Sequence, residues 1–319
     1  MQRTTFTNRN IDLAADLHLP ADLHLPAEPD AHERYPAVVV VHPGSGVKEQ
    51  TAGIYARRLA EIGYVALAFD ASYQGESGGE PRFLEDPATR VEDVRSAVDH
   101  LTTLGYVDEE RIGVLGICAG GGYAVNAALT DHRIRAVGTV SVINIGRAYR
   151  EAGGPEGSVA ATLEAAGRQR TAEARGADPL VTPWTPASAE EAAGAGIADA
   201  DVLEAVDYYR TPRGAHPRSS NQFLYRSAAQ LLGFDAFHLV EELLTQPLQV
   251  IVGDRVGSFG SYRDGHELYR RAPGPASLLV VEGAGHYDLY DRPEYVDQAV
   301  DRLGVFYREH LADAGHPAP

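Results

Sequence analysis

Gly116-Ile117-Cys118-Ala119-Gly120 stands where an apolar run, Arg111 to Ile117, gives way to a series of small residues. Apolar runs of this kind are typical of strands that helices cover on both faces. The glycines on either side of Cys118 permit a turn so tight that a Cβ at their positions would collide with the neighbouring strand or helix. The pattern predicts a nucleophile elbow of the G-x-S-x-G type, with sulfur in place of the hydroxyl.

The alternation of strand and helix extends along most of the chain and predicts an α/β domain with a mostly parallel central sheet. It stops between residues 143 and 242, where the sequence is rich in alanine and acidic residues and is interrupted by prolines. We therefore predict one core made of residues 1–142 and 243–319, with residues 143–242 inserted as a helical cap. The predicted core strands are Ala37 to Val41, Tyr64 to Phe69, Arg111 to Ile117, Ala136 to Val142, Leu248 to Val252 and Ser277 to Val281.

The N-terminal residues combine a hairpin pattern with a duplication. Thr4 to Thr7 and Ile11 to Ala15 alternate on either side of a turn at Asn8-Arg9-Asn10, which predicts two antiparallel strands. The hexapeptide Asp-Leu-His-Leu-Pro-Ala then occurs twice in tandem, at 16–21 and at 22–27. Its histidines leave a metal role open, but a duplication that lengthens a surface loop is the simpler interpretation.

Composition limits what the chain can bind. Its formal net charge of −17 at pH 7 repels nucleic acid and anionic lipid, and we find no basic patch that would offset this repulsion. No stretch has the uninterrupted apolar length of a bilayer span, and the N-terminus has no apolar signal region. The single cysteine excludes an intramolecular disulfide and a cysteine-based zinc cluster. We expect a cytoplasmic protein that acts on a small molecule without nucleic acid, membrane, metal or cofactor; the sequence leaves a homodimer open.

The position of Cys118 predicts a reactive thiol. The helix that begins after it supplies partial positive charge and free N–H groups, which lower the pKa of a thiol and offer the Ala119 amide to an oxyanion. Lone cysteines more often serve as small buried apolar side chains. The spacing of the elbow and the partners described next favour catalysis instead.

A base and an acid are expected at the ends of two later strands. Gly283-Ala284-Gly285-His286 directly follows the last apolar strand, and His286 would be the base. The strand before it ends in Asp254, whose carboxylate would hold the imidazole tautomer and favour the imidazolium. Asp288 and Asp291 are alternatives close to the histidine, but neither of them ends a strand.

A second oxyanion donor is expected in the loop His42-Pro43-Gly44-Ser45-Gly46, which follows the first core strand. The backbone N–H of Gly44 or Ser45 would donate there, since Pro43 has none. The same loop resembles a phosphate-binding loop only weakly, because the glycine-lysine-serine ending is absent. We therefore expect no nucleotide.

These motifs resemble those of known α/β-hydrolases. The cysteine elbow resembles that of dienelactone hydrolase, and the pattern from the His-Pro-Gly loop through residues 70–78 to the inserted segment resembles bacterial relatives of Xaa-Pro dipeptidyl-peptidases and fungal polyketide transferases. The resemblance covers nearly the whole chain and implies the α/β-hydrolase fold with acyl-transfer chemistry. It implies no substrate. Glu49 lies too far into its loop to match the glutamate of dienelactone hydrolase, and the peptidases use serine.

We therefore predict a hydrolase of ester or thioester bonds that forms an acyl-enzyme on Cys118. Transfer of an acyl or polyketide chain to an alcohol or amine is an alternative, because a thioester reacts readily with such acceptors. An inactive binding module on the same fold and a redox role for the thiol are further alternatives. Aromatic residues of the inserted segment fit either an acyl pocket or plain packing: Trp184, Tyr208, Tyr209, Phe223 and Tyr225.

Overall fold

An eight-stranded sheet in the order β1-β2-β4-β3-β5-β6-β9-β10 forms the centre of the molecule. The computed structural model describes residues 1–21, 23, 34–152 and 158–312. The first two strands pair antiparallel with each other, β2 pairs antiparallel with β4, and the remaining pairs are parallel. This sheet confirms the predicted α/β class. The strands are β1 (Gln2–Asn8), β2 (Ile11–His18), β3 (Tyr35–Val41), β4 (Val65–Phe69), β5 (Val107–Ile117), β6 (Ile134–Val140), β9 (Leu248–Gly253) and β10 (Ala276–Val281).

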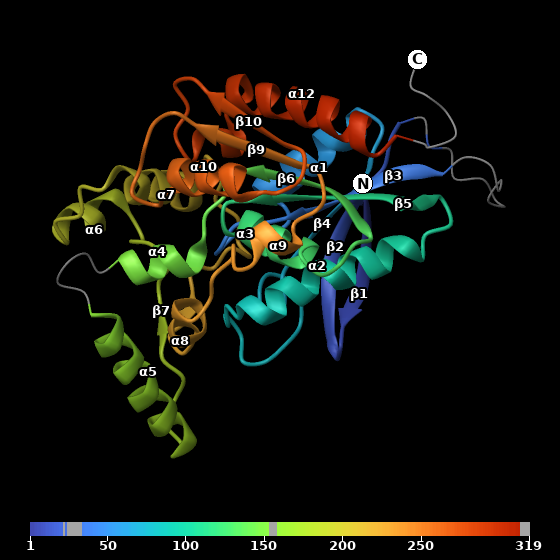
Figure 1. Cartoon of the computed structure of the whole chain (residues 1–319). Helices are drawn as coiled ribbons and strands as arrows, with labels where there is room; N and C mark the ends of the chain where they lie inside the picture. The colour runs from blue at the N-terminus through green and yellow to red at the C-terminus, as the bar shows by residue number, and fades with distance from the viewer. Residues whose placement is uncertain (22, 24–33, 153–157, 313–319) are drawn as a thin grey trace.

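Helices cover both faces of the sheet, which explains why its central strands are continuous apolar runs. On one face α1 (Thr51–Glu61) packs beside α12 (Pro293–His310). On the other face α2 (Pro87–Thr102) packs beside α3 (Ala119–Ala128), and α10 (Ser261–Arg271) packs on β9. Figure 1 shows α12 above the sheet and α2 below it. Within the described ranges, none of the helices is long and apolar enough to cross a bilayer.

A long connection joins β6 to β9 and contains the residues that the sequence predicts as an inserted cap. Its short strands β7 and β8 pair with each other outside the main sheet, and α5 extends away from the sheet at the lower left of Figure 1. The elements of this connection are α4 (Ile145–Glu151), α5 (Val159–Ala174), β7 (Val181–Thr182), α6 (Ala189–Gly194), α7 (Ala200–Arg210), β8 (Phe223–Leu224), α8 (Ser227–Leu232) and α9 (Val240–Leu243).

The predicted N-terminal hairpin is present, but its second strand is longer than expected. Asp16, Leu17 and His18 belong to β2, where their backbone groups pair with β4. The first copy of the hexapeptide therefore begins in a strand, because this edge completes the ladder and buries Leu17. Apart from Leu23, the second copy at 22–27, with His24, lies outside the described residues.

The parallel strands bring the predicted functional loops to one edge. β3, β5, β9 and β10 run in the same direction, so the loops at their carboxyl ends meet there. These loops carry Gly44, Cys118, Asp254 and His286, in that order.

Candidate active site

Cys118 occupies a strained turn between β5 and α3. Its φ of 56° lies in a region that residues with a Cβ rarely adopt. The two flanking glycines are required by space: a Cβ on Gly116 would lie 2.3 Å from the carbonyl oxygen of Gly120, and a Cβ on Gly120 would lie 2.3 Å from that of Val41. The turn therefore has the geometry of a nucleophile elbow, with the sulfur projecting beyond the edge of the sheet.

The environment of the sulfur differs from the sequence expectation. Cys118 is only 6% exposed, and this burial raises the pKa of its thiol to about 11. The Tyr290 hydroxyl and the Ala119 N–H, both beside the sulfur, lower that pKa, but burial has the larger effect. The helix N-terminus therefore does not produce a free thiolate, and the resting thiol is protonated at neutral pH.

His286 lies buried after β10. Its Nε2 is 3.1 Å from the hydroxyl of Tyr290, and the rings of Phe259 and Tyr287 pack beside the imidazole with centroid distances of 5.7 and 4.9 Å. Burial lowers the pKa of His286 to about 3, so the imidazole is neutral at rest. Its Nδ1 is buried without a hydrogen-bond partner among the described residues. The base predicted from the sequence thus shares Tyr290 as a neighbour with Cys118, and its second nitrogen is unsatisfied among the described residues.

The structure does not bring Asp254 to the imidazole. Its Oδ1 accepts a hydrogen bond of 2.8 Å from the backbone N–H of Gly283, and its own N–H bonds the carbonyl of Val281. In the ranges that the structure describes, no hydrogen bond joins Asp254 to His286. The carboxylate points toward the start of the histidine loop. The tight turn there, at Gly283 with a φ of 76°, leaves a backbone N–H that needs an acceptor. The structure thus joins Asp254 to the loop that carries His286, and the role of its carboxylate in a triad stays a prediction.

Two carboxylates of α7 approach the loops after β9 and β10 instead. Asp201 Oδ2 accepts the Phe259 N–H at 2.7 Å, and Glu204 Oε1 accepts Arg255 at 3.0 Å. Glu204 Oε2 is buried without a partner among the described residues, and a Cβ on Gly285 would lie 3.1 Å from it. Burial raises the pKa of both carboxyl groups. Their spacing of one helical turn is visible in the sequence, but nothing local indicates that this face of α7 meets the histidine loop.

The loop after β3 lies next to the elbow, as the sequence predicts. Gly44 and Ser45 line the same cavity as Cys118 and Ala119. Contacts from the inserted segment hold the loop: the Tyr209 hydroxyl donates to the Gly44 carbonyl at 3.4 Å, and Ser219 Oγ donates to the Ser45 carbonyl at 2.8 Å. These contacts use the carbonyl oxygens and leave the loop N–H groups to serve an oxyanion.

The buried side chain of His42 holds the backbone of this loop through hydrogen bonds. The Ala71 N–H and the Arg90 guanidinium both lie within hydrogen-bond distance of His42 Nε2, at 3.1 and 3.0 Å. Because both are donors, Nε2 is the accepting nitrogen, and Nδ1 carries the proton that bonds the Pro43 carbonyl at 2.6 Å. Burial is the main cause that lowers the pKa of His42 well below its usual value, so the ring is neutral and acts structurally.

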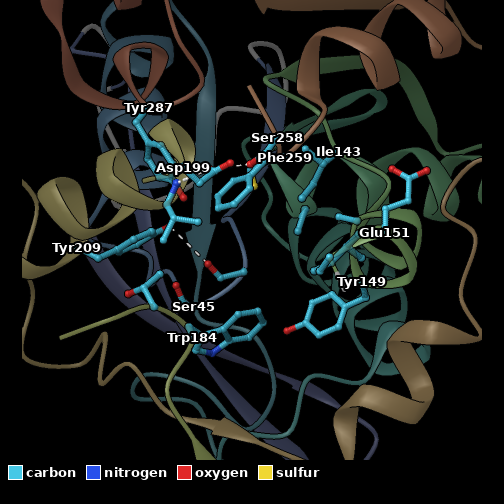
Figure 2. A pocket seen from close by; sticks show the side chains of 18 of the residues that line it. Ser45, Ile143, Tyr149, Glu151, Trp184, Asp199, Tyr209, Ser258, Phe259 and Tyr287 are labelled. Atoms are coloured by element: carbon cyan, nitrogen blue, oxygen red, sulfur yellow. Dashed lines mark hydrogen bonds between the residues drawn. The ribbon is translucent and has the colours of Figure 1, made fainter. Parts of the chain in front are cut away.

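A mostly apolar cavity of about 610 Å³ opens at the sulfur. Figure 2 shows Trp184, Ser45 and Tyr209 on one side and Tyr149 with Glu151 on the other. Of the five aromatic residues predicted for an acyl pocket, Trp184 and Tyr209 line it, whereas Tyr208, Phe223 and Tyr225 do not. Tyr208 and Phe223 are buried in packing around it. Four further aromatic residues that the sequence did not indicate line the cavity: Tyr149, Phe259, Tyr287 and Tyr290. The last two follow the base closely in the chain.

Comparison with known proteins gives the family. The sequence profile of the dienelactone hydrolase family matches residues 23–141, which include the elbow. Over 318 residues the chain is 43% identical to the uncharacterised protein YcjY of Escherichia coli (strain K12), covering 97% of this chain and 99% of YcjY. This chain belongs to the YcjY family of α/β-hydrolases. Like the superfamily, it is an enzyme of hydrolysis or acyl transfer.

Other relatives of this α/β-hydrolase extend the comparison. PA2218 of Pseudomonas aeruginosa is 38% identical over 320 residues, covering 97% of this chain and 81% of PA2218. Its crystal structure has a TM-score of 0.86 and covers 97% of this chain and 93% of that one. The polyketide transferase claH of Penicillium crustosum is 28% identical and covers 80% of this chain and 82% of claH. A thiohydrolase of Eupenicillium brefeldianum is 26% identical and covers 83% of each chain.

Proposed function

We propose that this enzyme hydrolyses ester or thioester bonds through a covalent acyl-enzyme on Cys118. The observation that carries the proposal is the position of the sulfur, which lies at the elbow, on the wall of an apolar cavity and beside the Gly44-Ser45 loop. A neutral imidazole, His286, lies 3.1 Å from the Tyr290 hydroxyl, which is itself beside the sulfur. Together these groups supply a nucleophile, a base and backbone donors for an oxyanion.

The reaction begins with both groups neutral. As the sulfur attacks the acyl carbonyl, its proton passes to His286, the sulfur–carbon bond forms and the carbonyl oxygen becomes an oxyanion. The N–H groups of Ala119 and of Gly44 or Ser45 stabilise that oxyanion. Collapse of the intermediate expels the alcohol or thiol, which takes the proton back from the imidazolium. Water then repeats these steps on the thioester and releases the acid.

In this scheme Asp254 has a positioning role. Its hydrogen bond to the Gly283 N–H fixes the start of the loop that carries His286. The set Cys118, His286 and Asp254 is thus retained from the sequence, with the carboxylate acting on the loop rather than on the ring.

The cavity favours an acyl group that is apolar or aromatic. Its walls include the rings of Trp184, Tyr149 and Phe259. The thiohydrolase among the relatives supports a thioester as substrate. Transfer to an alcohol or amine is a second candidate. Cys118 is only 6% exposed, which limits attack by bulk water, and another relative is a polyketide transferase.

Intact-mass spectrometry tests the proposal. The wild-type protein and Cys118→Ala are mixed with p-nitrophenyl acetate and with a panel of acyl thioesters. We expect a transient acyl adduct in the wild type and none in the variant. Shortening of the adduct's lifetime by added amine or alcohol would assign transfer, and a lifetime set by water would assign hydrolysis. A wild-type protein that forms no adduct with any substrate, while iodoacetamide still alkylates Cys118, would contradict the proposed function.

A further inference from the structure

Tyr290 stands between the sulfur of Cys118 and the imidazole of His286. Its hydroxyl lies 3.1 Å from His286 Nε2, and its proximity to the Cys118 sulfur, with which it lines the same cavity, lowers the pKa of the thiol. Within the described part of the chain, no hydrogen bond joins the sulfur directly to the imidazole. In catalytic triads the base commonly contacts the nucleophile itself. Here a phenol occupies the connecting position.

We propose that Tyr290 is a catalytic residue that relays the thiol proton from Cys118 to His286. The inference rests on the proposed function, because a relay has a task only if Cys118 is the nucleophile. Before attack, the thiol donates to the phenol oxygen and the phenol donates to Nε2. In the relay, the thiol proton moves to the phenol oxygen while the phenolic proton moves to Nε2. The products are a thiolate, an imidazolium and an unchanged phenol, so charge and atoms balance.

The relay also leaves the thiolate stabilised. After the transfer, the protonated Nε2 donates to the phenol oxygen and the new phenolic O–H donates to the sulfur, so that both hydrogen bonds persist with reversed direction. A hydrogen bond to an ionised acceptor is stronger than one between neutral groups. The phenol thus favours the thiolate at the moment of attack, which offsets part of the burial that raises the pKa of the resting thiol.

The surroundings of Tyr290 fix its hydroxyl and keep it neutral. Two hydrogen bonds from α1 hold the backbone of α11 (Asp288–Asp291): Thr51 Oγ1 donates to the Tyr290 carbonyl at 3.0 Å, and the Tyr55 hydroxyl donates to the Leu289 carbonyl at 2.8 Å. The rings of Tyr208 and Tyr287 pack against it with centroid distances of 5.0 and 4.7 Å. A phenol held in this way keeps its contacts with little loss of side-chain entropy on reaction.

The titratable groups that face this hydroxyl are the thiol, the imidazole and two further phenols. Tyr209, from α7, and Tyr287, whose ring centroid lies 4.7 Å from that of Tyr290, are these two phenols. Burial, the largest cause, raises the pKa of Tyr290 well above its usual value. The phenol is therefore not a base in its own right, and it conducts a proton without ionising.

The rate at which iodoacetamide alkylates Cys118, measured across a range of pH, tests the relay. Alkylation needs the thiolate but forms no oxyanion, so it separates the relay from any role in the oxyanion hole. Tyr290→Phe should lower the rate at neutral pH by about 10-fold or more and move the profile to higher pH. Tyr208→Phe is the matched control, since it removes a hydroxyl from the ring that packs on Tyr290 and does not line the cavity. Its profile should follow the wild type.

A Tyr290→Phe profile that coincides with the wild type would overturn the relay. If this variant does not fold, as judged by circular dichroism and thermal melting, 3-fluorotyrosine placed at position 290 takes its place. That phenol is nearly isosteric and a stronger donor, so the profile should move to lower pH, and an unchanged profile would again overturn the relay. The two proposals fail separately: a wild-type protein without an acyl adduct removes the proposed function, whereas an unchanged alkylation profile removes only the relay.

Discussion

The Asp254 carboxylate accepts the backbone N–H of Gly283 at 2.8 Å, three residues before the catalytic histidine proposed here. An asparagine at position 254 keeps an oxygen that can accept the same N–H, so we expect Asp254→Asn to change kcat/KM by less than about 3-fold. Asp254→Ala removes the acceptor and should lower kcat/KM by about 10-fold. A fall of about 10⁴ in Asp254→Asn, the scale seen when the carboxylate that holds a triad histidine is neutralised, would instead show that Asp254 contacts the imidazole during the reaction.

Glu204 gives the complementary prediction. Its Oε2 is buried and unpartnered beside the histidine loop, where the imidazolium would form. Glu204→Gln removes the charge that stabilises this cation, so we expect kcat to fall by about 10-fold or more with KM nearly unchanged. Glu190, on α6 and away from the cavity, provides the matched control as Glu190→Gln. Equal kcat values for Glu204→Gln and the control would show that Glu204 does not stabilise the imidazolium of His286.

The elbow leaves no space for a side chain at Gly120. A Cβ there would lie 2.3 Å from the Val41 carbonyl oxygen and 2.6 Å from that of His42. Neither backbone atom can move without shifting β3, so Gly120→Ala should lower the free energy of unfolding by about 2 kcal/mol or more. Gly105→Ala is the control, because nothing lies within 4 Å of an added Cβ at that position. Urea unfolding measures both, and equal midpoints would contradict the predicted clash.

The pH dependence of stability follows from the buried imidazole. The pKa of His286 is about 3 in the folded protein, against the ordinary histidine value of 6.5. As pH falls through this window, the unfolded chain binds a proton that the folded one does not, so the free energy of unfolding decreases by up to about 1.4 kcal/mol per pH unit. His286→Gln lacks this loss. Its stability relative to the wild type should therefore rise as pH falls from about 6 to 5, as measured by denaturant titration at each pH; a constant difference would contradict the burial of a neutral ring.

The sequence was sufficient for features that depend on local pattern. The glycine spacing around Cys118 and the apolar strands predict the elbow and the sheet, and the direction of parallel strands brings the loops of Gly44 and His286 to one edge. The properties of the site depend instead on packing between distant segments. The raised pKa of the thiol follows from burial, and the place of Tyr290 follows from α11 packing on α1.

The contacts of Asp254 also could not be predicted from local sequence. Asp254 ends β9 as predicted, but the direction of its carboxylate depends on which nearby donor is unsatisfied, and the turn at Gly283 provides one. Glu204 of α7 meets the histidine loop only because a segment more than 80 residues before His286 in the chain folds over it. Periodicity within α7 carries no information about that contact.

Gly44 and Trp184 limit the size of the acyl group that the cavity accepts. A methyl group on Gly44 would lie 3.4 Å from the ring of Trp184, which is ordinary contact, and would narrow the cavity between the oxyanion loop and the opposite wall. The N–H of residue 44 is retained, so Gly44→Ala should change kcat/KM for p-nitrophenyl acetate by less than about 3-fold. For an aromatic or long-chain acyl ester of the same phenol, we expect a fall of about 10-fold or more, because the added methyl and the acyl group compete for the same space. Trp184 is the chain's single tryptophan, so its fluorescence reports directly whether the acyl group enters beside it. Equal losses for both esters would indicate damage to the oxyanion loop rather than a narrower pocket, and no loss for either would place the acyl group elsewhere.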